Sequence, residues 1–156
     1  SVWYWINQVE PLLSLGRHED ALDVIDEALK LEPDNDSAWA RKGQVLRRIE
    51  RHADALDAYT KALEIAPNYG WAWNGKGLAH AALGQWDEAL ACYTEATKVA
   101  PRDVWFWHNR GEALMQLEQW AEAVRIFNKA LELDAHHQPS RDKRTAARRK
   151  LDSDEE

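Results

Sequence analysis

The stretch "GWAWNGKGLAHAALGQWDEALACYTEATKVAP", residues 70–101, has the pattern of two helices joined by a turn. Gly84 lies near its middle and suits a tight turn, and Pro101 at its end cannot continue a helix. On either side of Gly84 the residues expected in the core recur every three or four positions, the spacing of one helix face: Trp73, Gly77, His80 and Leu83, then Ala89, Tyr93 and Ala96. The stretch therefore predicts a helical hairpin.

The hairpin pattern recurs along the chain with a period of 34 residues. Several registers keep this period in phase: Trp5, Trp39, Trp73 and Trp107; Ala21, Ala55, Ala89 and Ala123; Ala28, Ala62, Ala96 and Ala130; Pro33, Pro67 and Pro101. A single unit of this size cannot bury its apolar face alone, so such units stack on one another. We therefore expect four units, 2–35, 36–69, 70–103 and 104–137.

Two helices are expected in each unit, and in the last three units they lie near 36–49, 53–66, 70–83, 87–100, 104–117 and 121–134. The first unit departs from the pattern. Val9 stands where the other units have glycine, and Pro11 lies inside the first expected helix. Proline in a helix interior costs about 3 kcal/mol. We therefore expect the first helix to be kinked or irregular, or to begin near Pro11.

These registers resemble the signature of the tetratricopeptide repeat family, which the third unit carries as Trp73, Gly77, Ala89, Tyr93, Ala96 and Pro101. The resemblance covers residues 2–137. It implies an all-α fold, an α-solenoid in which four helix-turn-helix repeats form a right-handed superhelix. The family's terminal helices imply a capping helix over 138–151, with Ala147 and Leu151 packed on the fourth unit. An acidic tail, 152–156, is expected to follow.

The composition is that of a soluble globular chain, with 45% hydrophobic and 30% charged residues. No apolar run approaches the ~18 residues that span a bilayer, so no membrane contact is expected. The single cysteine, Cys92, excludes an internal disulfide and fits a reducing compartment, which favours a cytoplasmic protein. The chain lacks an initial methionine and begins inside the repeat, which predicts that it is part of a longer protein.

The sequence carries no pattern typical of an enzyme or a metal site. "HEDAL", residues 18–22, lacks the second histidine of a zinc helix, and no serine lies in a nucleophile elbow. We expect no catalysis, no cofactor and no metal. The basic run 141–150 stands out in a chain of net charge −7. We interpret it as a solvated cap over a helix end, and nucleic-acid binding is the less favoured alternative.

Trp71 and Trp73 are two residues apart, so in a helix they face nearly opposite sides. Trp73 occupies the core tryptophan register of the family. In that family the first helices of successive units line a concave groove, which receives an extended peptide or a partner helix. The resemblance therefore assigns Trp73 to the fold. It assigns Trp71 to the groove, together with Trp3 and Trp105, which share its register.

Arginine, amide and apolar residues occupy the other groove registers. A chaperone-type carboxylate clamp would need lysine at a register that holds none: Ile6, Ala40, Asn74 and His108. Arg41 and Gly75 interrupt the asparagine ladder of a glycosyltransferase-type superhelix, and Arg47 should matter only for acidic ligands. We expect a protein or peptide partner to contact Trp3, Arg41, Gln44, Arg47, Trp71, Asn74, Leu78, Trp105, His108, Asn109 and Glu112. The alternatives are self-association, through the tryptophan face or end to end, and simple shielding of a neighbouring hairpin by Trp71.

Overall fold

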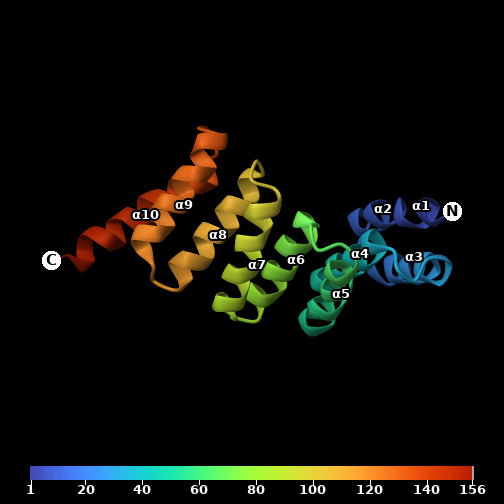
Figure 1. Ribbon diagram of the computed structural model, residues 1–156. Coiled ribbons are helices and arrows are strands. Elements are labelled where there is room, and N and C mark those ends of the chain that lie inside the picture. Colours follow the sequence, from blue (N-terminus) through green and yellow to red (C-terminus); the bar gives the residue numbers. More distant parts are fainter. Residues whose placement is uncertain (156) are drawn as a thin grey trace.

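The computed structural model describes residues 1–155, and within them it contains helices, turns and loops but no strand. The helices succeed one another from one end of the molecule to the other, so the two termini lie far apart (Figure 1). The prediction of an all-α solenoid is confirmed. No helix in this range is both long and apolar enough to cross a membrane. The helices are α1 (Val2–Ile6), α2 (Val9–Ser14), α3 (His18–Leu31), α4 (Asp36–Arg48), α5 (His52–Ile65), α6 (Gly70–Ala82), α7 (Trp86–Val99), α8 (Val104–Gln116), α9 (Trp120–Leu133) and α10 (Gln138–Asp154).

Each hairpin pairs a first helix with a second helix. The first helices are α4, α6 and α8, with α1 and α2 together in the first hairpin, and the second helices are α3, α5, α7 and α9. Each second helix also packs on the first helix of the next hairpin, and α10 packs on α9. In the last three hairpins every helix end lies within one residue of the position expected from the sequence.

The tryptophan that recurs every 34 residues ties each first helix to the loop before it. The indole Nε1–H of Trp73 donates a 2.8 Å hydrogen bond to the backbone carbonyl of Pro67. The equivalent residues form the same bond at 2.8 Å in the second unit and 2.9 Å in the fourth. A half-buried indole keeps its polar N–H paired in this way, and the ring closes the junction between two hairpins.

The bulky register of the second helices fills the space inside each hairpin. Tyr93 lies so close to Gly77 that a Cβ at that glycine would be 2.5 Å from the ring. Tyr59 and Phe127 make the same contact with the glycines of their own units. All three rings are buried. The small and the bulky registers therefore have one cause, because two helices can enclose a ring this tightly only where one of them lacks a side chain.

The turn inside each hairpin contains one residue in the left-handed region. In the first and third units this residue is a glycine, Gly16 and Gly84 respectively, each with φ 71°. In the second and fourth units it is a glutamate, Glu50 (φ 62°) and Glu118 (φ 58°). Backbone hydrogen bonds across the end of the first helix accompany each of them. Glycine adopts this conformation freely, whereas glutamate is strained in it by the contact between its Cβ and the backbone.

The first helix is irregular, as expected. The chain leaves the helix at Asn7 and Gln8, so that α1 and α2 are separate short helices. Pro11 lies in the first turn of α2, where a backbone N–H has no partner within the helix and its absence costs little. The interruption upstream of Pro11 therefore accommodates the proline.

The terminal helix is longer than expected. It runs to Asp154, so residues 152–154 of the expected acidic tail are helical. No glycine or proline follows Leu151 to end the helix, which explains its extension. Ala147 is fully buried, as expected for the face on the fourth unit, and Leu151 is half-buried. Glu156, the last residue of the expected tail, lies outside the described residues.

Candidate partner-binding surface

Contacts between successive first helices bring several of the side chains expected in the groove onto one face. The Asn109 side chain, on α8, donates a 2.9 Å hydrogen bond to Asn74 Oδ1 on α6. Arg41 Nη1, on α4, lies 3.3 Å from Glu10 Oε2 on α2. These contacts join neighbouring registers of successive first helices, so the residues in contact lie on a shared face. We call this surface, on α1, α2, α4, α6 and α8, the first-helix face.

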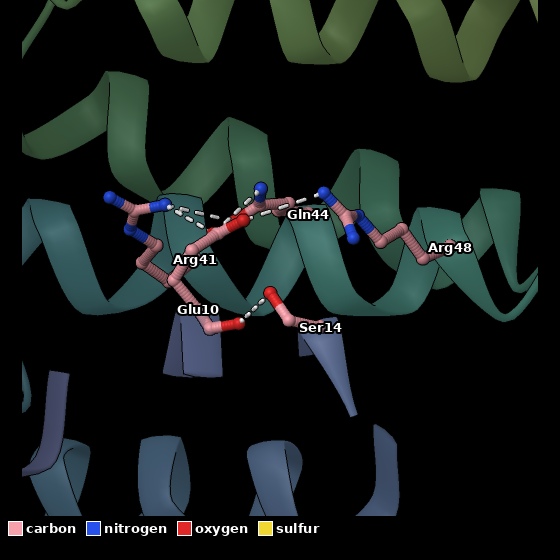
Figure 2. A network of polar contacts seen from close by, with 5 residues as sticks. All are labelled: Glu10, Ser14, Arg41, Gln44 and Arg48. Atoms are coloured by element: carbon pink, nitrogen blue, oxygen red, sulfur yellow. Dashed lines mark hydrogen bonds and ion pairs between the residues drawn. The ribbon is translucent and has the colours of Figure 1, made fainter. Parts of the chain in front are cut away.

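A polar network joins the first two units on this face (Figure 2). The carboxylate of Glu10 is its centre: Gln44 Nε2 donates to it at 3.4 Å, and Arg41 and Arg48 approach it at 3.3 and 3.6 Å. Ser14 Oγ donates to the backbone carbonyl of Glu10. The carboxylate thus neutralises part of the arginine cluster that the sequence shows in the second unit.

Trp71 is more enclosed than its register suggests. Its ring lies 6.4 Å from that of Tyr59 and 6.0 Å from that of Tyr69, and the Arg41 guanidinium covers it at 5.0 Å. Both Trp71 and Trp73 are half-buried, so the two tryptophans of α6 do not differ in burial although they face nearly opposite sides. The aromatic rings of the preceding unit enclose it, and periodicity on α6 alone could not reveal them. Its role in binding stays a prediction.

Trp3 and Trp105, which share the register of Trp71, are exposed, at 62% and 52%. Trp105 nevertheless has a defined setting, because it packs edge-on against the rings of His108 and His137. Ser37 holds the same register in the second unit and adds no ring there. Exposed aromatic surface therefore lies at the two ends of the first-helix face.

Gly75 interrupts the asparagine ladder for a steric reason. A Cβ at this position would be 2.4 Å from Cζ of Tyr59, whose ring reaches from α5 to the backbone of α6. The asparagine pair that remains, Asn74 with Asn109, joins two different registers of adjacent units. The first-helix face therefore lacks a continuous row of amides.

Arg47 and Leu78 lie deeper on the same face, and both are half-buried. Leu78 packs against the cluster around Tyr93. The Nε atom of Arg47 is buried and has no hydrogen-bond partner among the described residues. Burial raises the pKa of the Tyr59 phenol, and the Arg47 guanidinium nearby opposes that rise. Burial likewise raises the pKa of Tyr93, and Arg47 again opposes the rise.

A buried histidine pair at the last unit was not foreseen from the sequence. Nδ1 of His108 and Nδ1 of His137 lie 3.0 and 2.7 Å from the Ser140 hydroxyl. A hydroxyl carries one proton, so it donates to one imidazole and accepts from the other. His137 Nε2 is buried without a partner, which favours a proton on its Nδ1, because an unpaired buried N–H is costly. His108 then carries its proton on Nε2, 3.8 Å from Glu112.

Burial lowers the pKa of His108. The carboxylate of Glu112 opposes this effect, while His137 and the Lys143 ammonium add to it. Glu112 is itself paired with Lys143, at 2.7 Å. Since His137, Ser140 and Lys143 belong to α10 or its cap, the neutral His108 fastens the terminal helix to α8. Sequence periodicity could not find this site, because the terminal segment lies outside the repeats.

The basic run 141–150 is partly occupied by contacts within the chain. Lys143 pairs with Glu112, Arg144 donates to Asn128 Oδ1 at 2.9 Å, and Lys150 lies over the ring of Trp120. These contacts agree with the interpretation of the run as part of a cap. Arg141, Arg148 and Arg149 are exposed.

One hollow lies away from the first-helix face. It measures about 730 Å³ and opens between α3, α4 and α5, over Leu22, Leu46 and Ala58. Its rim carries ion pairs, among them Lys42 with Asp26 at 2.9 Å. These pairs satisfy the rim charges within the chain, so the hollow presents few free polar groups to a ligand.

The described residues contain no group of three or more side chains that could hold a metal ion. Cys92 is buried, and burial raises the pKa of its thiol to about 11. A thiol with this pKa is protonated at neutral pH and is a poor nucleophile. Cys92 therefore acts as a small apolar residue of α7, as its register indicates.

Comparison with known proteins identifies the relatives of this fold. A family model described as tetratricopeptide repeat matches residues 8–70 and 74–137. No curated protein sequence matches the chain. Among solved structures, pilF of Pseudomonas aeruginosa is similar with a TM-score of 0.89 and 21% identity, over 97% of this chain and 69% of that chain. MamA 41-end from Desulfovibrio magneticus RS-1 is similar with a TM-score of 0.77 and 25% identity, over 88% of this chain and 77% of that chain. YrrB, described as a TPR protein with an unusual peptide-binding site, is similar with a TM-score of 0.76 and 25% identity, over 92% of this chain and 74% of that chain.

Proposed function

The chain belongs to the tetratricopeptide repeat family, whose fold is a protein-interaction module, and we propose that its first-helix face binds an extended peptide or a helix of a partner protein. The similarity to YrrB, a protein with a peptide-binding site, supports the proposal. The proposal includes no catalysis, no cofactor and no metal, and a cytoplasmic location stays a prediction.

The setting of Trp105 is the observation that carries this proposal. An aromatic ring that is 52% exposed offers apolar surface to a ligand. The rings of His108 and His137 hold it edge-on, so the side chain loses little conformational freedom when a ligand binds. Fixed aromatic side chains beside an open surface are typical anchors in protein interfaces. Asn74 and Asn109 offer hydrogen-bonding groups on the same face.

Selection from a displayed library of random twelve-residue peptides tests the proposal. We expect the protein to enrich peptides that bind to the first-helix face. Trp105→Ala should weaken their binding by at least ~2 kcal/mol, roughly thirty-fold in Kd, because it removes an anchor side chain. The measurement is fluorescence anisotropy with the enriched peptides after labelling.

Leu31→Ala is the matched control, because Leu31 is 57% exposed but lies on α3, a second helix. Its Kd should equal that of the unchanged protein. Equal losses in the two variants, or no enriched peptide at all, would rule the proposal out.

Self-association is the competing function, favoured by the exposure of Trp3 (62%) and Tyr4 (64%) at the N-terminal end. Sedimentation of the free protein at several concentrations separates the two. A mass that grows with concentration, and stops growing in Trp3→Ala, would favour self-association over peptide binding. A constant monomer mass excludes it.

A further inference from the structure

Positive and negative charges are unevenly divided between the two layers of helices. The first helices contain six lysines and arginines against three aspartates and glutamates. The second helices contain five lysines and arginines against thirteen aspartates and glutamates. The protein as a whole has a net charge of −7. Three of the six cations, Lys42, Lys76 and Arg110, lie over the tryptophans that close the hairpin junctions. The positive charge of the first-helix face itself therefore comes from Arg41, Arg47 and Arg48 of α4, and it attracts negative charge there.

The carboxylates on the first-helix face are already paired with cations. Glu10 lies between Arg41 and Arg48, and Glu112 pairs with Lys143. The remaining carboxylate of the first helices, that of Asp36, lies at the N-terminus of α4. The face therefore presents little unpaired negative charge that would repel an acidic ligand.

Arg47 is the arginine of the α4 cluster that lacks a carboxylate. Within residues 1–155 no acidic side chain lies at ion-pair distance from it, whereas Arg41 and Arg48 share Glu10. Its side chain is half-buried and its Nε is enclosed, and its charge opposes the rise that burial causes in the pKa of both Tyr59 and Tyr93, which belong to two different second helices. A partly desolvated guanidinium that is held by its surroundings binds a carboxylate more strongly than an exposed one does.

We propose that the first-helix face selects an acidic peptide segment, and that Arg47 binds one carboxylate of that segment. The inference rests on the proposed function and names the chemistry of its partner. Apolar residues of the segment then contact apolar side chains at either side, among them Trp71 and Leu78. The ligand carboxylate supplies the counter-charge that the chain itself does not provide.

The same peptide selection, followed by matched substitutions on both partners, tests this inference. Enriched peptides should carry Asp or Glu more often than the starting library. Arg47→Gln should raise the Kd of such peptides at least ten-fold. Changing the critical Glu of a peptide to Gln should raise its Kd for the unchanged protein by the same factor as Arg47→Gln does. The same peptide change should leave the Kd for Arg47→Gln as it is, because both changes remove one and the same interaction.

Arg125→Gln is the matched control, since Arg125 lies on α9 and pairs with Glu122. It should leave the Kd unchanged, and thermal melting shows whether each variant folds. The substitutions on the peptide test the inference even if Arg47→Gln is unstable. Peptides that bind without an acidic residue, or equal affinity of Arg47→Gln and Arg125→Gln, would overturn the inference and leave peptide binding intact. Failure to enrich any peptide would overturn both proposals.

Discussion

At the scale of single residues, Glu50 and Glu118 are the places where the chain adopts a conformation its side chains do not favour. Both have positive φ at the register where the other units have glycine. The strain of a Cβ in this region is about 1–2 kcal/mol, part of which is offset because glycine loses more freedom on folding. We expect Glu118→Gly to raise the free energy of unfolding by about 0.5–1 kcal/mol, measured by urea denaturation.

Gly84→Ala is the converse change, at the same register and with φ 71°. No atom lies within 4 Å of the Cβ it would add, so steric crowding from other elements does not contribute. The free energy of unfolding of this variant should fall by about 1 kcal/mol because of backbone strain alone. Opposite signs for the two variants are required, and a loss of stability in Glu118→Gly would contradict this account of the turns.

At the scale of elements, the attachment of α10 should depend on pH. His108 is buried and its pKa lies below the ordinary value, so the detached state binds a proton more readily than the attached state. The contribution of this site to stability is complete above about pH 6.5, the ordinary histidine value, and decreases as the pH falls from there toward the lowered pKa. Hydrogen exchange of α10 amides should therefore accelerate relative to α7 between about pH 7 and 5.5.

His108→Gln should flatten this pH dependence, because the titrating group is absent while the amide can still bond to Ser140. His136→Gln is the control, since His136 is exposed beside the same helix and should retain the dependence. If α10 exchanges at the same relative rate at both pH values, His108 does not control its attachment.

At the scale of the whole molecule, the separation of charge between the helix layers predicts the response to salt. Acidic peptides should bind less tightly as NaCl rises from about 50 to about 500 mM, several-fold in Kd, because salt screens the attraction of the arginines of α4. Repulsion by the net charge of −7 alone would give the opposite trend. Anisotropy titrations at several salt concentrations distinguish the two, and tighter binding at high salt would show that net charge dominates.

The sequence alone was sufficient to predict where the helices of the last three hairpins begin and end. The spacing of three or four residues within a helix and the 34-residue period between hairpins are properties of the chain, and they placed the helices of the last three hairpins within one residue. Small and bulky registers also showed which residues meet inside a hairpin, as Gly77 and Tyr93 do. These contacts could be predicted because each hairpin forms within one short stretch of chain.

Contacts between hairpins were decided only by the tertiary structure. The enclosure of Trp71, the pairing of Arg41 and Arg48 by Glu10, and the histidine pair around Ser140 all join residues about 30 positions apart in different units. Their partners depend on the angle at which one hairpin packs on the next and on the side-chain rotamers at that junction. A periodic pattern specifies which residues share a register, but it does not specify which side chains of adjacent registers touch, and this is why the isolation of Arg47 became visible only in the folded chain.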